Sequence, residues 1–243
     1  MNTLYFKDEN ITLYTRTDHL MPEIQSETID VILCDPPYGV KYQSHTRVAT
    51  PLFSNMADDD NLSWVPEFLT EAHRVLKDPG ALVLFTRWDV YGDWQDYIEE
   101  AKFNLKQIWH WDKSDSAGGT GDLDGALYEV FEWIIYATKG RYKMHSKRRS
   151  NAFRYQRGSN KERWHPIQKP EALLQDILQV LCEGKDKPII CDPYSGSGST
   201  LMGAKKLGIR AVGYELPPDE NQQYANRMKE RFQGHHGHFQ ARL

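Results

Sequence analysis

The segment most suited to chemistry in this sequence is Asp35-Pro36-Pro37-Tyr38, which directly follows the apolar run at residues 29–34. Two consecutive prolines remove two backbone donors and restrict φ, so nearby carbonyl oxygens stay free to accept hydrogen bonds. The carboxylate of Asp35 and the carbonyl of Pro36 can each accept one amino proton, and Tyr38 can stack on a ring. These residues predict a site for a flat ring that bears an NH₂ group. A strand-ending turn with a capping aspartate is the alternative.

A second such segment, DPYSGSGST, runs from Asp192 to Thr200. Its glycines let the backbone approach a ligand closely, and the helix expected after it offers N-terminal amides to an anion. Ser199 stands where a P-loop needs lysine, and Leu201 stands where a dinucleotide fingerprint needs glycine, so both of those motifs fail. Glu215 ends the next apolar run and can accept both hydroxyls of a ribose. The alternative is a flexible loop beside an unrelated surface glutamate.

Both segments need a scaffold that brings strand ends together. Apolar runs predict seven strands, at residues 11–15, 29–34, 81–86, 106–112, 130–138, 188–191 and 210–214. Helical spacing predicts helices at residues 61–77, 93–102, 169–183 and 200–207 and from about residue 219 onward. Strands that alternate with helices favour an α/β protein with a mostly parallel sheet. Ligands of such sheets bind at the carboxyl ends of the strands, where both segments fall.

Composition excludes several classes of protein. Hydrophobic residues make up 40% and charged residues 26% of the 243, which is ordinary for one globular domain and unlike a disordered chain. Apolar stretches stay shorter than the roughly 18 residues of a membrane span. The first ten residues lack the layout of a signal peptide. The three cysteines show no zinc-binding or disulfide spacing. We therefore expect a cytoplasmic protein that binds no metal and no membrane.

Positive charge is concentrated in residues 139–163, which hold ten lysines and arginines and one acid, Glu162. This segment therefore carries +9, and because the whole chain carries −4 the remainder carries −13. A basic segment on an acidic body would bind a polyanion at one face and repel it elsewhere. A solvated loop that happens to be basic is the alternative interpretation.

Taken together, these motifs resemble those of S-adenosylmethionine-dependent DNA amino-methyltransferases, in particular the permuted beta class. The sequence DPPY at 35–38 matches the catalytic motif of that family, and DPYSGSGST at 192–200 resembles its cofactor loop. HPIQKP at 165–170 resembles the segment that opens the helix beside the cofactor. The catalytic motif precedes the cofactor loop, as in the circularly permuted class. Tyr194 in place of phenylalanine and Ile167 in place of threonine depart from the family pattern.

The resemblance implies a Rossmann-like methyltransferase fold. Its sheet would have about seven mostly parallel strands, with a hairpin at one edge formed around residues 106–112 and 130–138. Residues 1–243 would be a single catalytic domain, and residues 139–164 would be a small inserted basic segment that recognises the DNA target.

The implied reaction is methyl transfer from S-adenosylmethionine to the N6 amino group of adenine in double-stranded DNA, with the base flipped out of the duplex onto Tyr38. Adenine is favoured over cytosine because the family's adenine enzymes usually begin the tetrapeptide with Asp or Asn. N4-cytosine methylation, an RNA substrate and a catalytically silent cofactor-binding subunit are the alternatives. A nicotinamide oxidoreductase is disfavoured by the failed dinucleotide fingerprint.

The resemblance also assigns individual residues. The catalytic residues are Asp35, Pro36, Pro37 and Tyr38. The cofactor-binding residues are Asp18, Asp35, His165, Gln168, Lys169, Asp192, Tyr194, Ser195, Gly196, Ser197, Gly198, Ser199, Thr200 and Glu215. For Asp18, a helix-capping role is the alternative. The DNA-binding residues are Lys143, Lys147, Arg148, Arg149, Arg154, Arg157, Arg163 and Trp164. A second copy of the chain and a cognate restriction enzyme are further partners expected for such a protein, in the cytoplasm of its own cell or of a phage's host.

Overall fold

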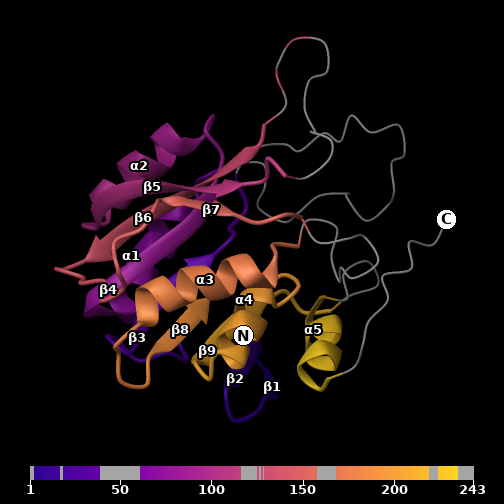
Figure 1. The fold of residues 1–243 in the computed structure, drawn as a ribbon. Coiled ribbons are helices and arrows are strands. Elements are labelled where there is room, and N and C mark those ends of the chain that lie inside the picture. Colours follow the sequence, from indigo (N-terminus) through magenta and orange to yellow (C-terminus); the bar gives the residue numbers. More distant parts are fainter. Residues whose placement is uncertain are drawn as a thin grey trace.

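A nine-stranded β-sheet with helices on both faces organises the computed structural model (Figure 1). The structure describes residues 3–16, 19–38, 61–115, 125, 127, 129–157, 168–218 and 224–234. Its strands are β1 (Thr3–Lys7), β2 (Ile11–Thr15), β3 (Ile29–Cys34), β4 (Leu76–Thr86), β5 (Asn104–Asp112), β6 (Phe131–Lys139), β7 (Ala152–Arg154), β8 (Ile189–Asp192) and β9 (Arg210–Glu215). Its helices are α1 (Val65–Val75), α2 (Tyr91–Glu100), α3 (Glu171–Cys182), α4 (Ser199–Lys206) and α5 (Tyr224–Phe232).

The strand order, β1-β2-β9-β8-β3-β4-β6-β5-β7, places a parallel block in the middle of the sheet. Neighbouring strands β2, β9, β8, β3 and β4 all run in one direction. The antiparallel hairpin of β5 and β6 joins this block at β4, and β1 pairs antiparallel with β2 at the other side. The predicted α/β, Rossmann-like fold with a mostly parallel sheet and a hairpin is therefore confirmed.

All seven predicted strands are present, and β1 and β7 are additional. Strand β7 has only three residues and pairs in parallel with β5, so it lies outside the hairpin that was expected to form the edge. Strand β4 starts earlier than the predicted residue 81, because it begins at Leu76, which pairs with Ile29 of β3, while its pairing with β6 begins at Gly80. The register of β3 against β4 shifts here, since Ile29 pairs with Leu76 and Val31 already pairs with Ala81, so β4 has extra residues between these two pairs. Helix α1 therefore ends at Val75, two residues earlier than predicted.

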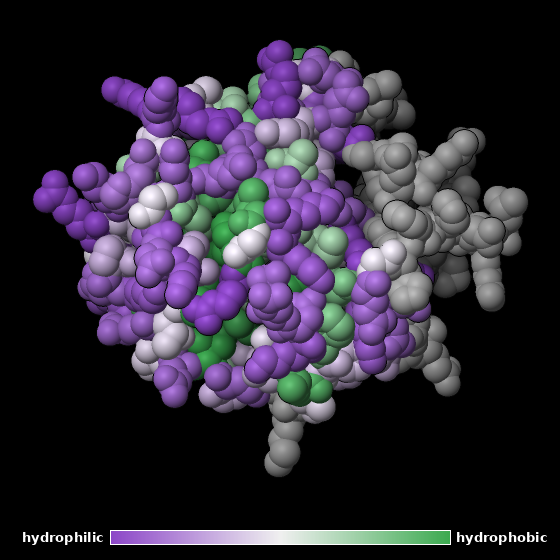
Figure 2. Space-filling view, turned by 60° about the horizontal axis from the view of Figure 1, so that its bottom comes forward, coloured by the Kyte–Doolittle hydropathy of each residue, from purple (hydrophilic) through white to green (hydrophobic). Residues whose placement is uncertain are grey.

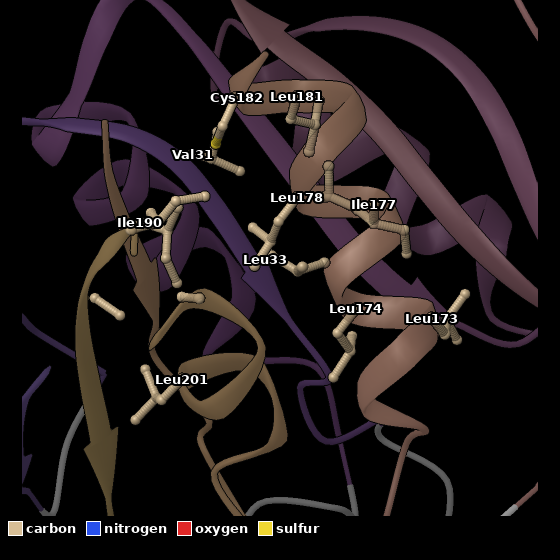
Figure 3. Close-up of a cluster of buried hydrophobic side chains, with 14 of the residues drawn as sticks. Val31, Leu33, Leu173, Leu174, Ile177, Leu178, Leu181, Cys182, Ile190 and Leu201 are labelled. Atoms are coloured by element: carbon tan, nitrogen blue, oxygen red, sulfur yellow. The ribbon is translucent and has the colours of Figure 1, made fainter. Parts of the chain in front are cut away.

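Apolar side chains alternate between two clusters, one on each face of the sheet. On β3, Val31 and Leu33 face α3 and α4, whereas Ile32 and Cys34 face α1 and α2. This alternation is the period of two expected for a strand that is buried on both sides. Figure 3 shows the first cluster, in which Leu178 of α3 lies over the strand that carries Leu33. Packing in the two clusters fixes the position of each strand in the sheet, and therefore where the residues that follow each strand lie.

The described surface exposes few large apolar side chains. The view in Figure 2 is mostly hydrophilic, with smaller hydrophobic areas between the polar groups. Within the described ranges, no helix combines the length and the apolar character needed to cross a membrane. The large apolar side chains exposed there are Leu4, Leu20, Trp88, Leu127 and Phe131.

We predict that Leu178→Ala lowers the free energy of unfolding by about 2–5 kcal/mol, because it leaves a cavity between α3 and the sheet. Leu4→Ala is the matched control, since Leu4 is 52% exposed, and should change this free energy by less than about 0.5 kcal/mol. Urea unfolding followed by circular dichroism measures both values. Equal losses in the two variants would contradict the packing described here.

Candidate active site

Three acids of the predicted site lie at the same edge of the sheet. Asp35 directly follows β3, Asp192 ends β8 and Glu215 ends β9. The three strands are neighbours in parallel register, with Ile32 opposite Cys191 and Asp192 opposite Gly213. The charges of Asp35 and Glu215 are close enough to act on the carboxyl group of Asp192. The structure thus brings together two segments that are more than 150 residues apart in the sequence.

Both carboxylate oxygens of Asp35 accept hydrogen bonds within the protein. The hydroxyl of Tyr38 donates to Oδ1, and the ammonium of Lys169 donates to Oδ2 at 2.6 Å. Burial, together with the charge of Asp35, raises the pKa of Tyr38 well above its usual range, so its hydroxyl stays protonated. Of the two prolines between them, Pro36 is buried and Pro37 partly buried. The predicted catalytic tetrapeptide is therefore a fixed structure with its acid held from two sides.

Two residues of this site were missed by sequence reasoning, Glu132 on β6 and Lys113 just after β5. Lys169 Nζ lies 3.1 Å from Glu132 Oε2, and Lys113 Nζ lies 2.9 Å from Glu132 Oε1. Burial alone would raise the pKa of Glu132, but these two ammonium groups hold it below its usual value. A lone acid in the apolar run VFEWIIYAT was the available signal, because buried carboxylates are almost always paired.

The loop between β8 and α4 is bonded to the two other acids. Gly196 donates its backbone N–H to Glu215 Oε2 at 2.6 Å, and Tyr194 donates its N–H to Asp192 Oδ1 at 3.0 Å. The hydroxyl of Ser195 donates to the backbone oxygen of Asp192 at 2.9 Å. These bonds hold the loop against the strand ends. They leave further lone pairs on both carboxylates that can accept hydrogen bonds from a ligand.

The two loop glycines have different roles. An added Cβ at Gly196 would lie 4.0 Å from the carbonyl oxygen of Tyr194, so the space beside this glycine is open. An added Cβ at Gly198 would instead lie 2.8 Å from Met228 Cγ and 3.0 Å from Phe232 Cζ, both in α5. Both its φ of +74° and the packing of α5 therefore require glycine at position 198, and its predicted contact with the cofactor stays a prediction.

The remaining loop side chains are held inside the protein. Ser197, Ser199 and Thr200 are all buried, and the hydroxyls of the two serines lie 3.1 Å apart. Arg231 of α5 donates to the carbonyl oxygen of Ser197 at 2.6 Å. The side chain of Thr200 is hydrogen-bonded to Asp192. These residues shape the loop and the start of α4.

Tyr194 lies in an aromatic cluster beside the loop. Its ring is 5.5 Å from that of Trp64 and 5.3 Å from that of Phe68, between centroids. The guanidinium of Arg16 lies 4.9 Å from the ring centre. The hydroxyl of Tyr194, which the family's phenylalanine lacks, lies 3.0 Å from His19 Nδ1 and makes a hydrogen bond with it. The departure from the family motif is therefore matched by a local partner.

Four predicted site residues, Asp18, His165, Arg163 and Trp164, lie outside the described residues. Gln168 is described, partly buried, and directly precedes Lys169. Among the described residues, no group of three His, Cys, Asp or Glu side chains is arranged to hold a metal ion.

The basic segment runs from the amino-terminal ends of the parallel strands towards their carboxyl ends. It begins at Lys139, which is buried at the edge opposite Asp35 and donates to the carbonyl oxygen of Leu76 at 2.8 Å. It reaches the edge near Asp112 through β7. A cavity of about 500 Å³ lies beside it, with Trp109 and Lys147 among the lining residues. Lys139 is therefore unavailable to a polyanion, whereas the middle of the segment lies at the surface.

The predicted DNA-binding residues divide into two groups. Five of them, Lys143, Lys147, Arg148, Arg149 and Arg154, are exposed, and the last two form ion pairs. Arg149 donates two hydrogen bonds to the carboxylate of Asp176 in α3, one of them from Nη2 to Oδ2 at 2.7 Å. Arg154 Nε donates to Asp112 Oδ2 at 3.0 Å. Arg157 is partly buried. Arg149 and Arg154 thus fasten the segment to α3 and β5, a role that the sequence did not reveal.

Comparison with known proteins adds a family and a set of relatives. A family profile described as DNA methylase, N6_N4_Mtase, matches residues 29–227. The chain is 26% identical to the putative methylase YubD of Escherichia coli over 81% of this chain and 80% of that protein. It is 25% identical to the type II methyltransferase M2.DpnII of Streptococcus pneumoniae, over 87% and 86%. It is 24% identical to the DNA adenine methyltransferase YhdJ of Escherichia coli, over 81% and 74%.

Solved structures share the fold. The PvuII DNA methyltransferase, described as cytosine-N4-specific, superposes with a TM-score of 0.71 at 14% identity, over 99% of this chain and 90% of that one. The M1.HpyAVI–SAM complex gives a TM-score of 0.61 at 20% identity, over 84% and 90%. At such identities the likeness establishes the arrangement of strands and helices alone.

We predict that Glu215→Gln makes the stability of the protein less dependent on pH between about 4.5 and 7. Burial raises the pKa of Glu215 from 4.5 to about 7, so in this window the folded state holds a proton that the unfolded state has lost. Glu215 therefore contributes stability that is present at pH 4.5 and is lost as the pH rises through 7. Urea unfolding at several pH values measures the effect as the difference between wild type and variant. A constant difference across the window would contradict it.

Proposed function

Because the chain belongs to the N6_N4_Mtase family of DNA methylases, we propose that it transfers a methyl group from S-adenosylmethionine to the N6 amino group of adenine in DNA. The observation that carries this proposal is the position of Asp35, at the strand end next to Asp192 and Glu215. An acceptor for amino protons thereby lies beside acids and a glycine loop suited to a nucleoside-bearing methyl donor.

The described residues fit S-adenosylmethionine. The space at Gly196 allows a ligand to approach the loop backbone, and Glu215 is placed to accept hydrogen bonds from ribose hydroxyls. Asp192 lies at the same strand ends as Asp35, close enough for their charges to interact. When bound, S-adenosylmethionine supplies an electrophilic methyl group on a sulfonium. The protein's own part is to hold the acceptor nitrogen in line with it.

Asp35 and Pro36 would activate that nitrogen. An exocyclic amino group is a poor nucleophile because its lone pair is delocalised into the ring. Hydrogen bonds from its two protons to the Asp35 carboxylate and the Pro36 carbonyl favour a pyramidal nitrogen, whose lone pair then points at the methyl group. Orientation and preorganised acceptors lower the barrier to the displacement. The attacking nitrogen afterwards loses one proton along its bond to Asp35.

Adenine rather than cytosine is the base that we propose. The support is the aspartate at the start of the tetrapeptide and the similarity to YhdJ, which is described as a DNA adenine methyltransferase. The base must leave the duplex to reach Asp35, since the amino group is otherwise inside the stack. A second copy of the chain, a cognate restriction enzyme and a cytoplasmic location stay predictions that rest on the resemblance.

We propose that three exposed residues of the basic segment, Lys143, Lys147 and Arg148, contact the DNA directly. Their side chains are exposed on the surface of a chain that is otherwise acidic, so a polyanion would be attracted to them. Arg149 and Arg154 serve this contact indirectly, because their ion pairs with Asp176 and Asp112 hold the segment in place.

We predict that the wild-type protein, given unmethylated duplex DNA and methyl-labelled S-adenosylmethionine, places the label in N6-methyladenine. Asp35→Ala should lower the transfer rate at least about a thousandfold while cofactor affinity changes by less than about tenfold, because the acid acts on the amino group. Digestion to nucleosides identifies the labelled base, and calorimetry measures affinity. Label in N4-methylcytosine would overturn the choice of base, and label in RNA alone would overturn DNA as the substrate.

We predict that Lys147→Ser with Arg148→Ser flattens the salt dependence of DNA binding. Each phosphate contact contributes about 0.9 to the slope of log affinity against log salt, so losing two contacts should reduce it by about 1.8. Lys7→Ser with Arg210→Ser is the matched control. Both residues are exposed, and they lie on β1 and β9, across the sheet from β7 and the basic segment. Fluorescence anisotropy at four salt concentrations gives the slopes. Identical slopes in the two double variants would make the segment an ordinary solvated loop.

A further inference from the structure

Four charged side chains alternate in sign along a partly buried row at the catalytic edge. Asp35 follows β3, Glu132 lies on β6 and Lys113 follows β5, while Lys169 reaches the row from the residues before α3. Successive nitrogen–oxygen distances along the row are 2.6 Å from Asp35 to Lys169, 3.1 Å from Lys169 to Glu132 and 2.9 Å from Glu132 to Lys113. Two carboxylates and two ammonium groups thus balance one another.

The strands place this row on the sheet face that α3 covers. Side chains two positions apart on a strand share a face, and the neighbours at that spacing belong to the core cluster under α3, namely Leu33, Trp111 and Ile134. Phe85 of β4 lies between the two carboxylates in the strand order, and Lys169 Nζ is 5.0 Å from its ring centre. Lys169 therefore lies above the sheet between Asp35 and Glu132.

In this arrangement each oxygen of Asp35 already accepts one hydrogen bond, which weakens Asp35 as an acceptor for the amino group to be methylated. Tyr38 donates to one of its oxygens and Lys169 to the other, so an incoming amino group competes with both for the charge and the remaining lone pairs of Asp35. Lys169 has a second acceptor within reach. Among the described residues, Glu132 Oε2 accepts no hydrogen bond of good geometry, although the ammonium of Lys169 is only 3.1 Å away.

We propose that Glu132 is a positioning residue that takes up the ammonium of Lys169 and so frees Asp35 when the target amino group binds. The proposal rests on the function proposed above and assigns a residue outside its sequence motifs. Lys169 then moves along the row by a change of side-chain torsions, and no covalent bond is altered. Lys113 stays on the other oxygen of Glu132 throughout.

The charge of Glu132 is essential to this role. The side chain of Lys169 is 11% exposed, so leaving Asp35 without another anion would strand a buried positive charge. Burial opposes the charge of Lys169, but Asp35 and Glu132 together raise its pKa well above its usual range. The ammonium is thus retained in either position. An amide at position 132 would keep the shape and lose the attraction, so Lys169 would stay on Asp35.

Glu132→Gln should therefore slow methyl transfer without weakening cofactor binding. We expect the single-turnover rate on unmethylated DNA to fall at least about tenfold, with affinity for S-adenosylmethionine within about threefold of wild type. Glu129→Gln is the matched control, because it makes the same change on an exposed glutamate at the same edge. Glu132→Asp, which retains the charge, should recover part of the rate. Thermal midpoints of all variants are measured alongside.

A double-mutant cycle with Lys169→Met separates this role from a structural one. The Lys169→Met variant has no ammonium for Glu132 to attract. Adding Glu132→Gln to it should therefore lower the single-turnover rate by less than about twofold relative to Lys169→Met alone. An equal fractional loss in both backgrounds would overturn the proposal. The proposal would also be overturned if Glu132→Gln and Glu129→Gln had equal rates, or if Glu132→Asp recovered none of the lost rate. These two comparisons do not require Lys169→Met to fold. Absence of any transfer by the wild type would instead overturn the proposed function.

Discussion

The common direction of β2, β9, β8, β3 and β4 is the constraint on which the rest of this structure depends. Parallel neighbours in register end at the same edge, so the residues after each strand are brought together whatever their distance in sequence. Asp35, Asp192 and Glu215 meet for this reason alone. The apolar clusters on the two faces keep the strands in register, and a shift of one residue would turn each side chain at the edge to the opposite face.

Charged groups at this edge are buried far more than is usual, and each has an opposite charge or a backbone partner. Lys169 lies between two carboxylates, and Arg231 pairs with Glu171 while donating to the carbonyl oxygen of Ser197. Such pairs offset the loss of water around the charges but add little net stability. Their value lies in geometry, since each one orients an acid or a loop that the proposed chemistry uses.

Helix α3 links the two regions to which we assign a function. Lys169, which holds Asp35, lies two residues before its first turn, and Asp176 on the same helix binds both Arg149 and Tyr155 of the basic segment. Helix α3 therefore contacts the basic segment and also closely follows Lys169, the partner of Asp35. The two regions were independent features of the sequence, and a single helix joins them in the structure.

The sequence by itself determined the seven main strands, the helices between them and the positions of Asp35, Asp192 and Glu215 at strand ends. These follow from the spacing of apolar residues, which is a local property of the chain. Only the tertiary structure decided which strands are neighbours, and hence that Glu132 lies beside Lys169, that Arg149 and Arg154 are held in ion pairs, and that Gly198 is required by α5. Such pairings join residues tens of positions apart, and the order of strands that creates them is set by packing of the whole sheet rather than by any local pattern.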